Sequence, residues 1–116
     1  MPLHTTTDPA ALASFQESQD GYVIFYSSRD AHGKMWCPDC RDVEALVERT
    51  FSPSEGPTGM IAYVGQRAEW RIASNPFRKA PWNVQSIPTI IRVRSSKETG
   101  RLVESEITEA TLADLL

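Results

Sequence analysis

Residues 35–41 read Met35-Trp36-Cys37-Pro38-Asp39-Cys40-Arg41 and contain both cysteines of this 116-residue chain. Proline is favoured at the first position of a helix, because its missing N–H is not needed there. We therefore expect a helix to begin at Pro38, which places both sulfur atoms on one turn, close enough to bond. The free N–H groups and the dipole of that turn stabilise the thiolate of Cys37, the form that attacks disulfides.

Charged neighbours act on this thiolate in opposite directions. Asp39 lies between the two cysteines, and a carboxylate there disfavours further negative charge. Lys34 and Arg41 carry positive charge and favour the thiolate. The sequence leaves the balance between these effects open.

The cysteine pair predicts thiol–disulfide exchange in two steps. Cys37 attacks a disulfide of the substrate and forms a mixed disulfide with it. Cys40 then attacks this intermediate, which releases the reduced product and leaves a Cys37–Cys40 disulfide. An external reductant must return the pair to its dithiol form.

Two other uses of the pair fit the sequence less well. A zinc site usually has four ligands, and only His4 and His32 could join the cysteines, neither at a zinc-finger spacing. Free cysteines are also often buried and inert. Pro38 and Asp39 suit an exposed helix start better than a core, so we expect a redox pair and no metal.

A second element, Ile87-Pro88-Thr89, opens a run of strand-forming residues. Proline is tolerated at the start of a strand, and an X-Pro bond can be cis, commonly in a tight turn. A cis Pro88 that faces the cysteines would expose the backbone of Ile87, which could then pair with an extended substrate. An ordinary trans proline that opens a strand is the alternative.

Strand and helix patterns alternate along the chain. Strand patterns occur at 22–26, 59–65, 89–93 and 102–106. Helix patterns with capping residues occur from Asp8 to 20–21, from Pro38 to about Thr50 and after Thr108. A first strand either lies at 3–6 or is absent. Short helical turns and loops are expected over 66–86, and a turn is expected over 95–100.

This order predicts one α/β domain over residues 1–116, with a mixed central sheet flanked by helices. In the first helix, Leu12 and Phe15 share one face and are expected to pack inward. In the last helix, Leu112, Leu115 and Leu116 are expected to do the same.

Composition and charge are those of an ordinary globular protein. Hydrophobic residues make up 41% and charged residues 23% of the chain, which excludes a largely disordered chain and a disulfide scaffold. The net charge of −3 gives no global attraction to nucleic acid or to an anionic membrane. No apolar run approaches the ~20 residues that cross a bilayer, and the N-terminus lacks a secretory signal. We therefore expect a cytoplasmic protein with reduced thiols.

The chain resembles thioredoxin-fold proteins at Trp36-Cys37-Pro38-Asp39-Cys40 and at Ile87-Pro88-Thr89. More narrowly, it resembles the Clot family, the small thioredoxin-related proteins of the thioredoxin domain-containing protein 17-like group. This family carries Pro-Asp between the cysteines, where ordinary thioredoxins carry Gly-Pro. Further matching stretches lie at 28–34, 64–67, 70–71, 75–78 and 102–106. The resemblance spans most of the chain and implies a thioredoxin-like three-layer sandwich.

The resemblance also implies a function, that of a cytosolic disulfide reductase for cystine and protein disulfides. Thioredoxin reductase would recycle it with electrons from NADPH, which would not bind to this chain, since no dinucleotide fingerprint is present. The implied site consists of the nucleophile Cys37, the resolving thiol Cys40 and the supporting residues Trp36, Pro38, Asp39, Ile87 and Pro88. The protein would act as a monomer. The alternative is a redox-sensing or binding module that docks signalling partners without repeated turnover.

Proton transfer at Cys40 has no obvious carrier in the sequence. Thioredoxin places a buried Asp in the strand before its active site, whereas residues 22–27 contain no carboxylate. Asp39 and a water molecule remain as candidates for the group that accepts the proton of Cys40. His32, in the loop before the cysteines, could also assist, although a surface histidine is the simpler interpretation.

Basic and aromatic residues in the second half allow two interpretations each. A cationic rim for an anionic substrate could be formed by Arg67, Arg71, Arg78 and Lys79. A solvated loop face, balanced by Glu69, is the more ordinary use of these charges. Trp70 and Trp82 could line a substrate groove or pack in the core.

Overall fold

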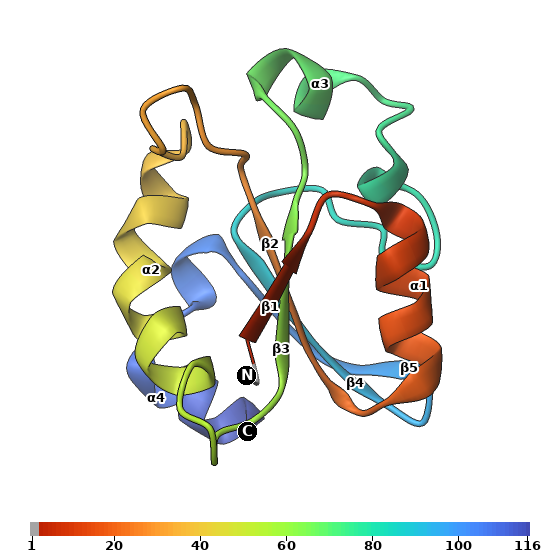
Figure 1. Ribbon diagram of the computed structural model, residues 1–116, viewed down its shortest axis with the longest axis vertical. Coiled ribbons are helices and arrows are strands. Elements are labelled where there is room, and N and C mark those ends of the chain that lie inside the picture. Colours follow the sequence, from red (N-terminus) through yellow and green to blue (C-terminus); the bar gives the residue numbers. More distant parts are fainter. Residues whose placement is uncertain (1–2) are drawn as a thin grey trace.

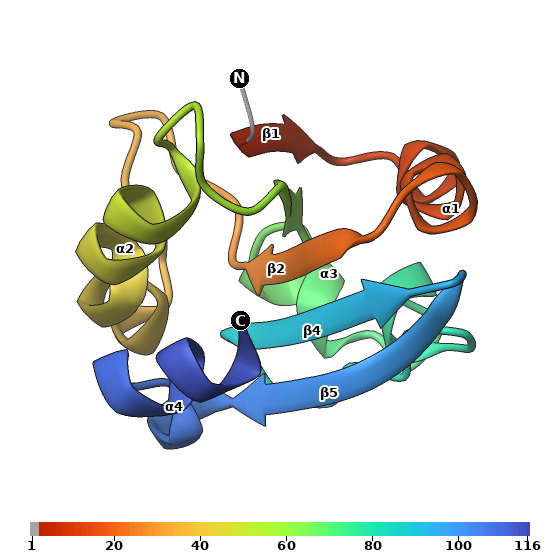
Figure 2. The ribbon, with the colours of Figure 1, turned by 90° about the horizontal axis from the view of Figure 1, so that it is seen from below.

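A five-stranded mixed sheet in the order β1-β3-β2-β4-β5 forms the centre of the computed structural model (Figures 1 and 2). The structure describes residues 3–116. The strands are β1 (Leu3–Thr6), β2 (Gly21–Tyr26), β3 (Gly59–Tyr63), β4 (Thr89–Arg94) and β5 (Lys97–Val103). β1 and β2 run parallel to β3, which lies between them, whereas β4 runs antiparallel to both β2 and β5.

Helices cover both faces of this sheet. They are α1 (Pro9–Ser18), α2 (Pro38–Phe51), α3 (Arg67–Arg71) and α4 (Glu109–Leu115), with the 3₁₀ helices η1 (Pro76–Arg78) and η2 (Glu104–Glu106). α2 and α4 lie on one side of the sheet and α1 lies on the other (Figure 1). The predicted sandwich of helices around a mixed sheet is confirmed. Within residues 3–116, no helix is both long enough and apolar enough to cross a membrane.

Strand β2 runs through the core, and all six of its residues are buried. On one face, the Tyr22 ring lies 5.4 Å from the ring of Phe51 in α2. On the other face, Phe25 lies 5.9 Å from Phe77 and 5.6 Å from Trp82. A strand that packs against layers on both sides is apolar throughout, which explains the continuous run recognised in the sequence.

The N-terminal elements agree with the prediction. A strand occupies Leu3–Thr6, and Asp8 caps α1 through a 2.9 Å hydrogen bond that its carboxylate accepts from the N–H of Ala10. Leu12 and Phe15 are buried, as expected. The helix ends at Ser18, slightly before the predicted boundary, because Gly21 already belongs to β2.

The middle of the chain also follows the predicted pattern. α2 runs on to Phe51, which is fully buried. β3 ends at Tyr63, before the predicted end of the strand, because the chain turns at Gly65 with φ +112°. The short helical turns expected over 66–86 are α3 and η1.

The β4–β5 hairpin differs from the prediction. The turn is confined to Ser95 and Ser96, and β5 begins at Lys97 rather than at 102. Both serines have positive φ, 52° and 65°, which suits a tight two-residue hairpin. Ser-Ser is not the usual Asn-Gly signal for such a turn, so the sequence suggested a longer one. Residues 104–106 form η2 instead of continuing the strand.

The C-terminal helix places its leucines unequally. Thr108 caps α4 by accepting a 3.2 Å hydrogen bond from the N–H of Thr111. Leu112 is buried and Leu115 is half-buried. Leu116 is 45% exposed, so its predicted inward packing is wrong; the helix ends one residue earlier.

Candidate active site

Strand order brings the two sequence motifs to the same edge of the sheet. β2 leads through a loop to α2 and its cysteines, and β4 starts directly after Pro88. β2 and β4 pair antiparallel with Phe25 opposite Thr89. The end of β2 therefore lies beside the start of β4, and Cys37 meets the Ile87–Pro88 segment there.

Cys37 is the residue that caps α2, and Pro38 is the first residue of the helix. Its backbone is extended, with φ −89° and ψ 115°, and its thiol makes no capping bond. The Sγ atom lies 3.8 Å from the carbonyl oxygen of Ile87. The residue is 8% exposed, so a small part of it meets solvent at the helix start, where the free N–H groups favour an anion.

Cys40 lies one turn deeper and is fully buried. The N–H of Ser27 points to its Sγ at 3.5 Å. Burial raises the pKa of the Cys40 thiol well above its ordinary value, the Cys37 thiol raises it further, and the Ser27 hydrogen bonds lower it. Cys40 therefore keeps its proton in the dithiol state at neutral pH.

Ser27 joins the two cysteines and was not recognised from the sequence. Besides its contact with Cys40, its hydroxyl oxygen accepts a 3.2 Å hydrogen bond from the N–H of Cys37. The residue is fully buried. Its signal in the sequence is weak: a polar residue that directly follows the apolar run of β2.

Tyr26 adds a buried hydroxyl near the same thiol. The residue is 1% exposed, and among residues 3–116 its hydroxyl has no hydrogen-bond partner. Burial raises the pKa of this phenol far above its ordinary value, and the charge of a Cys40 thiolate would raise it further. The phenol therefore stays neutral.

Trp36 is fixed beside Cys37 by two contacts. Its ring N–H donates a 3.0 Å hydrogen bond to the carbonyl of Gly65. The guanidinium carbon of Arg67 lies 4.8 Å from the centre of its ring, a cation–π distance. The predicted packing of Trp36 at the site thus involves Gly65 and Arg67, neither of which lies near it in the sequence.

The other predicted supporting residues divide by exposure. Pro38 and Asp39 are exposed, whereas Ile87 and Pro88 are buried. The Ile87–Pro88 peptide is cis, as is the Ala80–Pro81 peptide, for which the sequence offered no signal. Since Asp39 lies at the surface and Cys40 in the interior, the group observed at the Cys40 sulfur is Ser27 rather than Asp39.

The loop before the cysteines closes on itself around Asp30. Its carboxylate accepts hydrogen bonds from the N–H groups of Lys34 at 3.1 Å and His32 at 2.8 Å. Both hydrogen bonds lower the pKa of Asp30, and the bond from Lys34 has the larger effect. Arg29 anchors the loop to α2 through an ion pair with Glu44. The His32 side chain is exposed and makes no hydrogen bond to either cysteine.

The basic residues grouped in the sequence are separated in the structure. Arg78 stacks on Trp70, with its guanidinium carbon 3.8 Å from the ring centre, and donates a 2.7 Å hydrogen bond to the Trp70 carbonyl. Arg78 therefore stabilises the packing around Trp70, whereas Arg67 lies over Trp36, next to Cys37. Trp70 and Trp82 are 6% and 4% exposed, so they pack in the core rather than line a groove.

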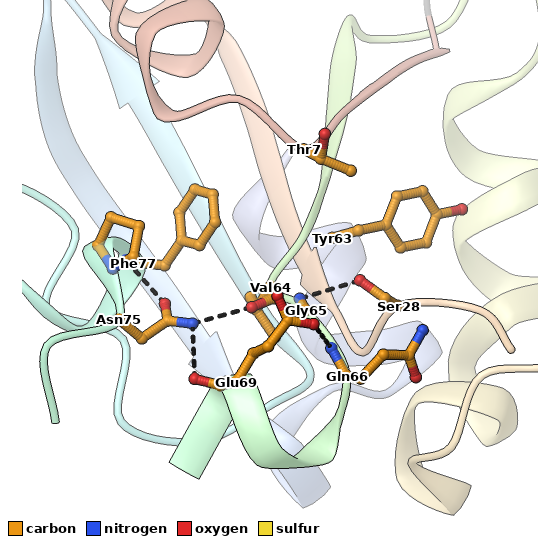
Figure 3. Close-up of a pocket in the computed structure, with 10 residues that line it drawn as sticks. Thr7, Ser28, Tyr63, Val64, Gly65, Gln66, Glu69, Asn75 and Phe77 are labelled. Carbon is orange, nitrogen blue, oxygen red and sulfur yellow. Dashed lines mark hydrogen bonds between the residues drawn. The ribbon is translucent and has the colours of Figure 1, made fainter. Parts of the chain in front are cut away.

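A pocket of about 320 Å³ is lined in part by Gly65, whose carbonyl binds the ring N–H of Trp36 (Figure 3). Its walls are formed by Thr7, Ser28, residues 63–66, Glu69 and residues 75–77. Asn75 ties these walls together, because its amide donates to the carbonyls of Val64 at 2.9 Å and Glu69 at 3.2 Å. Neither cysteine lines this pocket. Among residues 3–116, no cluster of three or more His, Cys, Asp or Glu side chains could hold a metal ion.

A five-stranded sheet with a cysteine pair at the start of α2 and a cis proline before β4 defines a thioredoxin-fold protein. Solved structures agree. A reduced thioredoxin pre-protein of Schistosoma mansoni gives a TM-score of 0.63 at 15% identity, over 97% of this chain and 93% of that chain. The Trxlp protein of Edwardsiella tarda gives 0.65 at 18% identity, over 98% and 97%. At such identities the likeness shows the fold alone.

The chain belongs to the family described as thioredoxin domain-containing protein 17-like, thioredoxin domain, whose model matches residues 5–116. Thioredoxin domain-containing protein 17 of Homo sapiens is 35% identical over 96 residues, which cover 82% of this chain and 75% of the relative. The thioredoxin-like protein Clot of Arabidopsis thaliana is 28% identical over 92 residues, 77% of this chain and 69% of the relative. The resemblance drawn from the Trp-Cys-Pro-Asp-Cys motif is confirmed.

Proposed function

We propose that this protein is a cytosolic thiol–disulfide oxidoreductase that reduces cystine and protein disulfides. The observation that carries the proposal is the unequal placement of the two thiols. Cys37 is 8% exposed at the start of α2, whereas Cys40 is fully buried one turn later. A substrate can reach the first sulfur, and only Cys37 can reach the second.

In the first step, the Cys37 thiolate attacks one sulfur of the substrate disulfide. The S–S bond breaks, one substrate thiolate leaves and takes a proton, and a mixed disulfide remains on Cys37. Cys40 then loses its proton and attacks the Cys37 sulfur, which expels the second substrate thiolate. Two electrons pass from the dithiol to the substrate, and a Cys37–Cys40 disulfide remains.

The contacts of Cys40 support this order. Its raised pKa, caused mainly by burial, keeps it from competing with Cys37 for substrate. The Ser27 N–H at 3.5 Å is placed to stabilise negative charge on the sulfur once the mixed disulfide has formed. The backbone closest to the Cys37 sulfur is the carbonyl of Ile87, at 3.8 Å, and an extended substrate would pair with this segment.

The proposed reductant is NADPH acting through thioredoxin reductase, with no cofactor bound to this chain and the protein working as a monomer. The test measures NADPH consumption with thioredoxin reductase, this protein and cystine, beside a Cys37→Ser control. We expect sustained consumption that the control abolishes. Absence of consumption with accessible thiols would instead favour a redox-sensing or binding module, or glutathione as the reductant.

The roles of the two cysteines are tested by trapping. Cys40→Ser should accumulate mixed disulfides on Cys37, because the resolving thiol is missing, and Cys37→Ser should trap nothing. Equal trapping by both variants, measured by mass spectrometry under non-reducing conditions, would overturn the assignment.

A further inference from the structure

Arg67 is held in one place beside the nucleophile. Its guanidinium carbon lies 4.8 Å from the centre of the Trp36 ring, and its Nη2 lies 3.5 Å from the carbonyl oxygen of Trp36. That carbonyl belongs to the peptide that also carries the Cys37 N–H. Trp36 is itself fixed by its hydrogen bond to Gly65. The cation therefore lies next to the backbone of Cys37.

Apart from its contact with Trp36, Arg67 has no charged partner among residues 3–116. The ion pairs among residues 3–116 involve Arg29, Arg49 and Arg101, and not Arg67. Glu69, the nearest acidic residue in the sequence, accepts a 2.8 Å hydrogen bond from the N–H of Gln66 and so caps α3. Glu69 therefore does not pair with Arg67, and the Arg67 side chain is exposed.

A stacked arginine keeps most of its donors available. A guanidinium has five N–H groups at its rim, and stacking uses its face. Among residues 3–116, only the Trp36 carbonyl accepts a hydrogen bond from the rim of Arg67. The remaining donors can bind a carboxylate with two parallel hydrogen bonds. The stacked Arg78 differs, because it is half-buried and donates to the backbone carbonyls of Trp70 and Gln85.

We propose that Arg67 is a specificity-determining residue that selects disulfides with a carboxylate close to the sulfur atoms. This inference rests on the proposed disulfide-reductase function and names the substrate class of that site. The carboxylate binds the rim of the guanidinium while the adjoining sulfur meets Cys37. Neutral disulfides gain nothing from Arg67, and cationic disulfides are repelled by it.

The test uses three disulfides of equal chain length and different charge: 3,3′-dithiodipropionate, 2-hydroxyethyl disulfide and cystamine. Each is mixed with the pre-reduced protein, and the second-order rate constant of protein thiol oxidation is measured. In each reaction the dithiol gives two electrons and two protons to the disulfide, which becomes two thiols. Arg67→Gln should slow oxidation by the dipropionate about two- to fivefold, the range of an exposed ion pair. This slowing should remain when the rate constant is divided by that for the neutral hydroxyethyl disulfide, and by the same measure oxidation by cystamine should become faster.

The matched control is Arg71→Gln, which removes the same charge from an exposed position at the other end of α3. It should leave the ratio of the three rate constants unchanged. Arg67→Lys should keep the anionic preference of the wild type, and added salt should weaken that preference.

Four results would overturn the inference. Arg67→Gln and Arg71→Gln behave alike, or Arg67→Gln changes all three rate constants by one factor, which would mean that Arg67 acts on the Cys37 thiolate. In the third, none of the disulfides oxidises the wild-type protein, and the proposed function fails together with the inference. Oxidation by all three disulfides with no effect of Arg67→Gln overturns the inference alone.

Discussion

The N–H of Ser27 lies 3.5 Å from the sulfur of Cys40. The hydroxyl of the same serine accepts a 3.2 Å hydrogen bond from the N–H of Cys37. One buried residue at the end of β2 thus contacts both members of the cysteine pair. It fixes the start of α2 against the sheet and gives the interior sulfur a donor, in a strand end that carries no acid.

Replacing Ser27 with alanine should destabilise the reduced protein by about 1–3 kcal/mol, because the buried N–H of Cys37 loses its acceptor. Urea unfolding of the reduced protein measures this change. Ser14→Ala is the control, since Ser14 is exposed on α1 and its loss should change the free energy of unfolding by less than about 0.5 kcal/mol. Equal stability of Ser27→Ala and the wild type would show that the hydroxyl does not hold the helix start.

Alkylation should distinguish the two thiols. Cys37 is 8% exposed and Cys40 is fully buried, and burial raises the pKa of Cys40. Iodoacetamide near neutral pH should therefore label Cys37 about tenfold faster or more, since a thiol loses reactivity with each unit of raised pKa. Mass spectrometry of the native dithiol protein gives the rates. Comparable labelling of Cys37→Ser and Cys40→Ser would contradict the buried position of Cys40.

The stability of the reduced protein should fall in alkaline solution because of Cys40. Its pKa is raised in the folded state, mainly by burial. Below about pH 8.5, the ordinary thiol pKa, both the folded and the unfolded state keep the proton, and the stabilisation is fully present. Above that pH the unfolded state releases its proton first. The free energy of unfolding then falls by up to about 1.4 kcal/mol per pH unit, until the folded thiol also titrates.

Urea unfolding of the reduced protein at about pH 8, 9 and 10 measures this slope. Cys40→Ala serves as the comparison, because it removes the thiol and keeps the rest of the core. The free energy of unfolding of Cys40→Ala should fall less steeply with rising pH than that of the wild type. Parallel curves would mean that Cys40 titrates alike in the folded and unfolded states.

Local signals account for the part of the site that could be predicted. Pro38 marks the helix start, the apolar run of β2 marks a central strand, and Ile87-Pro88 marks the start of β4. Each of these features depends on residues adjacent in the sequence. Ser27 and Gly65 were missed because their contacts join distant positions: Ser27 bonds to Cys37, and Gly65 bonds to Trp36.

The basic residues also show that contacts between distant positions cannot be predicted from local sequence. Arg67 and Arg78 lie close in the sequence, which allowed either one cationic rim or, more ordinarily, a solvated loop face. In the structure each stacks on a different tryptophan, Arg67 on Trp36 and Arg78 on Trp70. Only tertiary packing assigns one to the active site and the other to the fold. The Ser95-Ser96 turn was misjudged for a local reason, because serine rarely signals two successive residues with positive φ.

Gly65, whose carbonyl binds Trp36, has a backbone conformation that residues other than glycine avoid. Its φ is +112°, and a Cβ atom there would lie 2.9 Å from the Cβ of Glu69. Its carbonyl accepts the hydrogen bond from Trp36, and its N–H donates a 2.9 Å bond to the hydroxyl of Ser28. A side chain at position 65 would therefore suffer backbone strain and a steric clash, at a residue whose backbone makes two hydrogen bonds.

Gly33 provides a matched comparison, because it also has positive φ, +77°, but a Cβ atom there would meet nothing within 4 Å. Gly33→Ala should cost about 1 kcal/mol, the price of the left-handed conformation alone. Gly65→Ala should cost about 2–3 kcal/mol, since the clash with Glu69 adds to the strain. Urea unfolding of both variants gives the two values. If Gly65→Ala is no more destabilising than Gly33→Ala, the chain around Gly65 relaxes enough to remove the clash with Glu69.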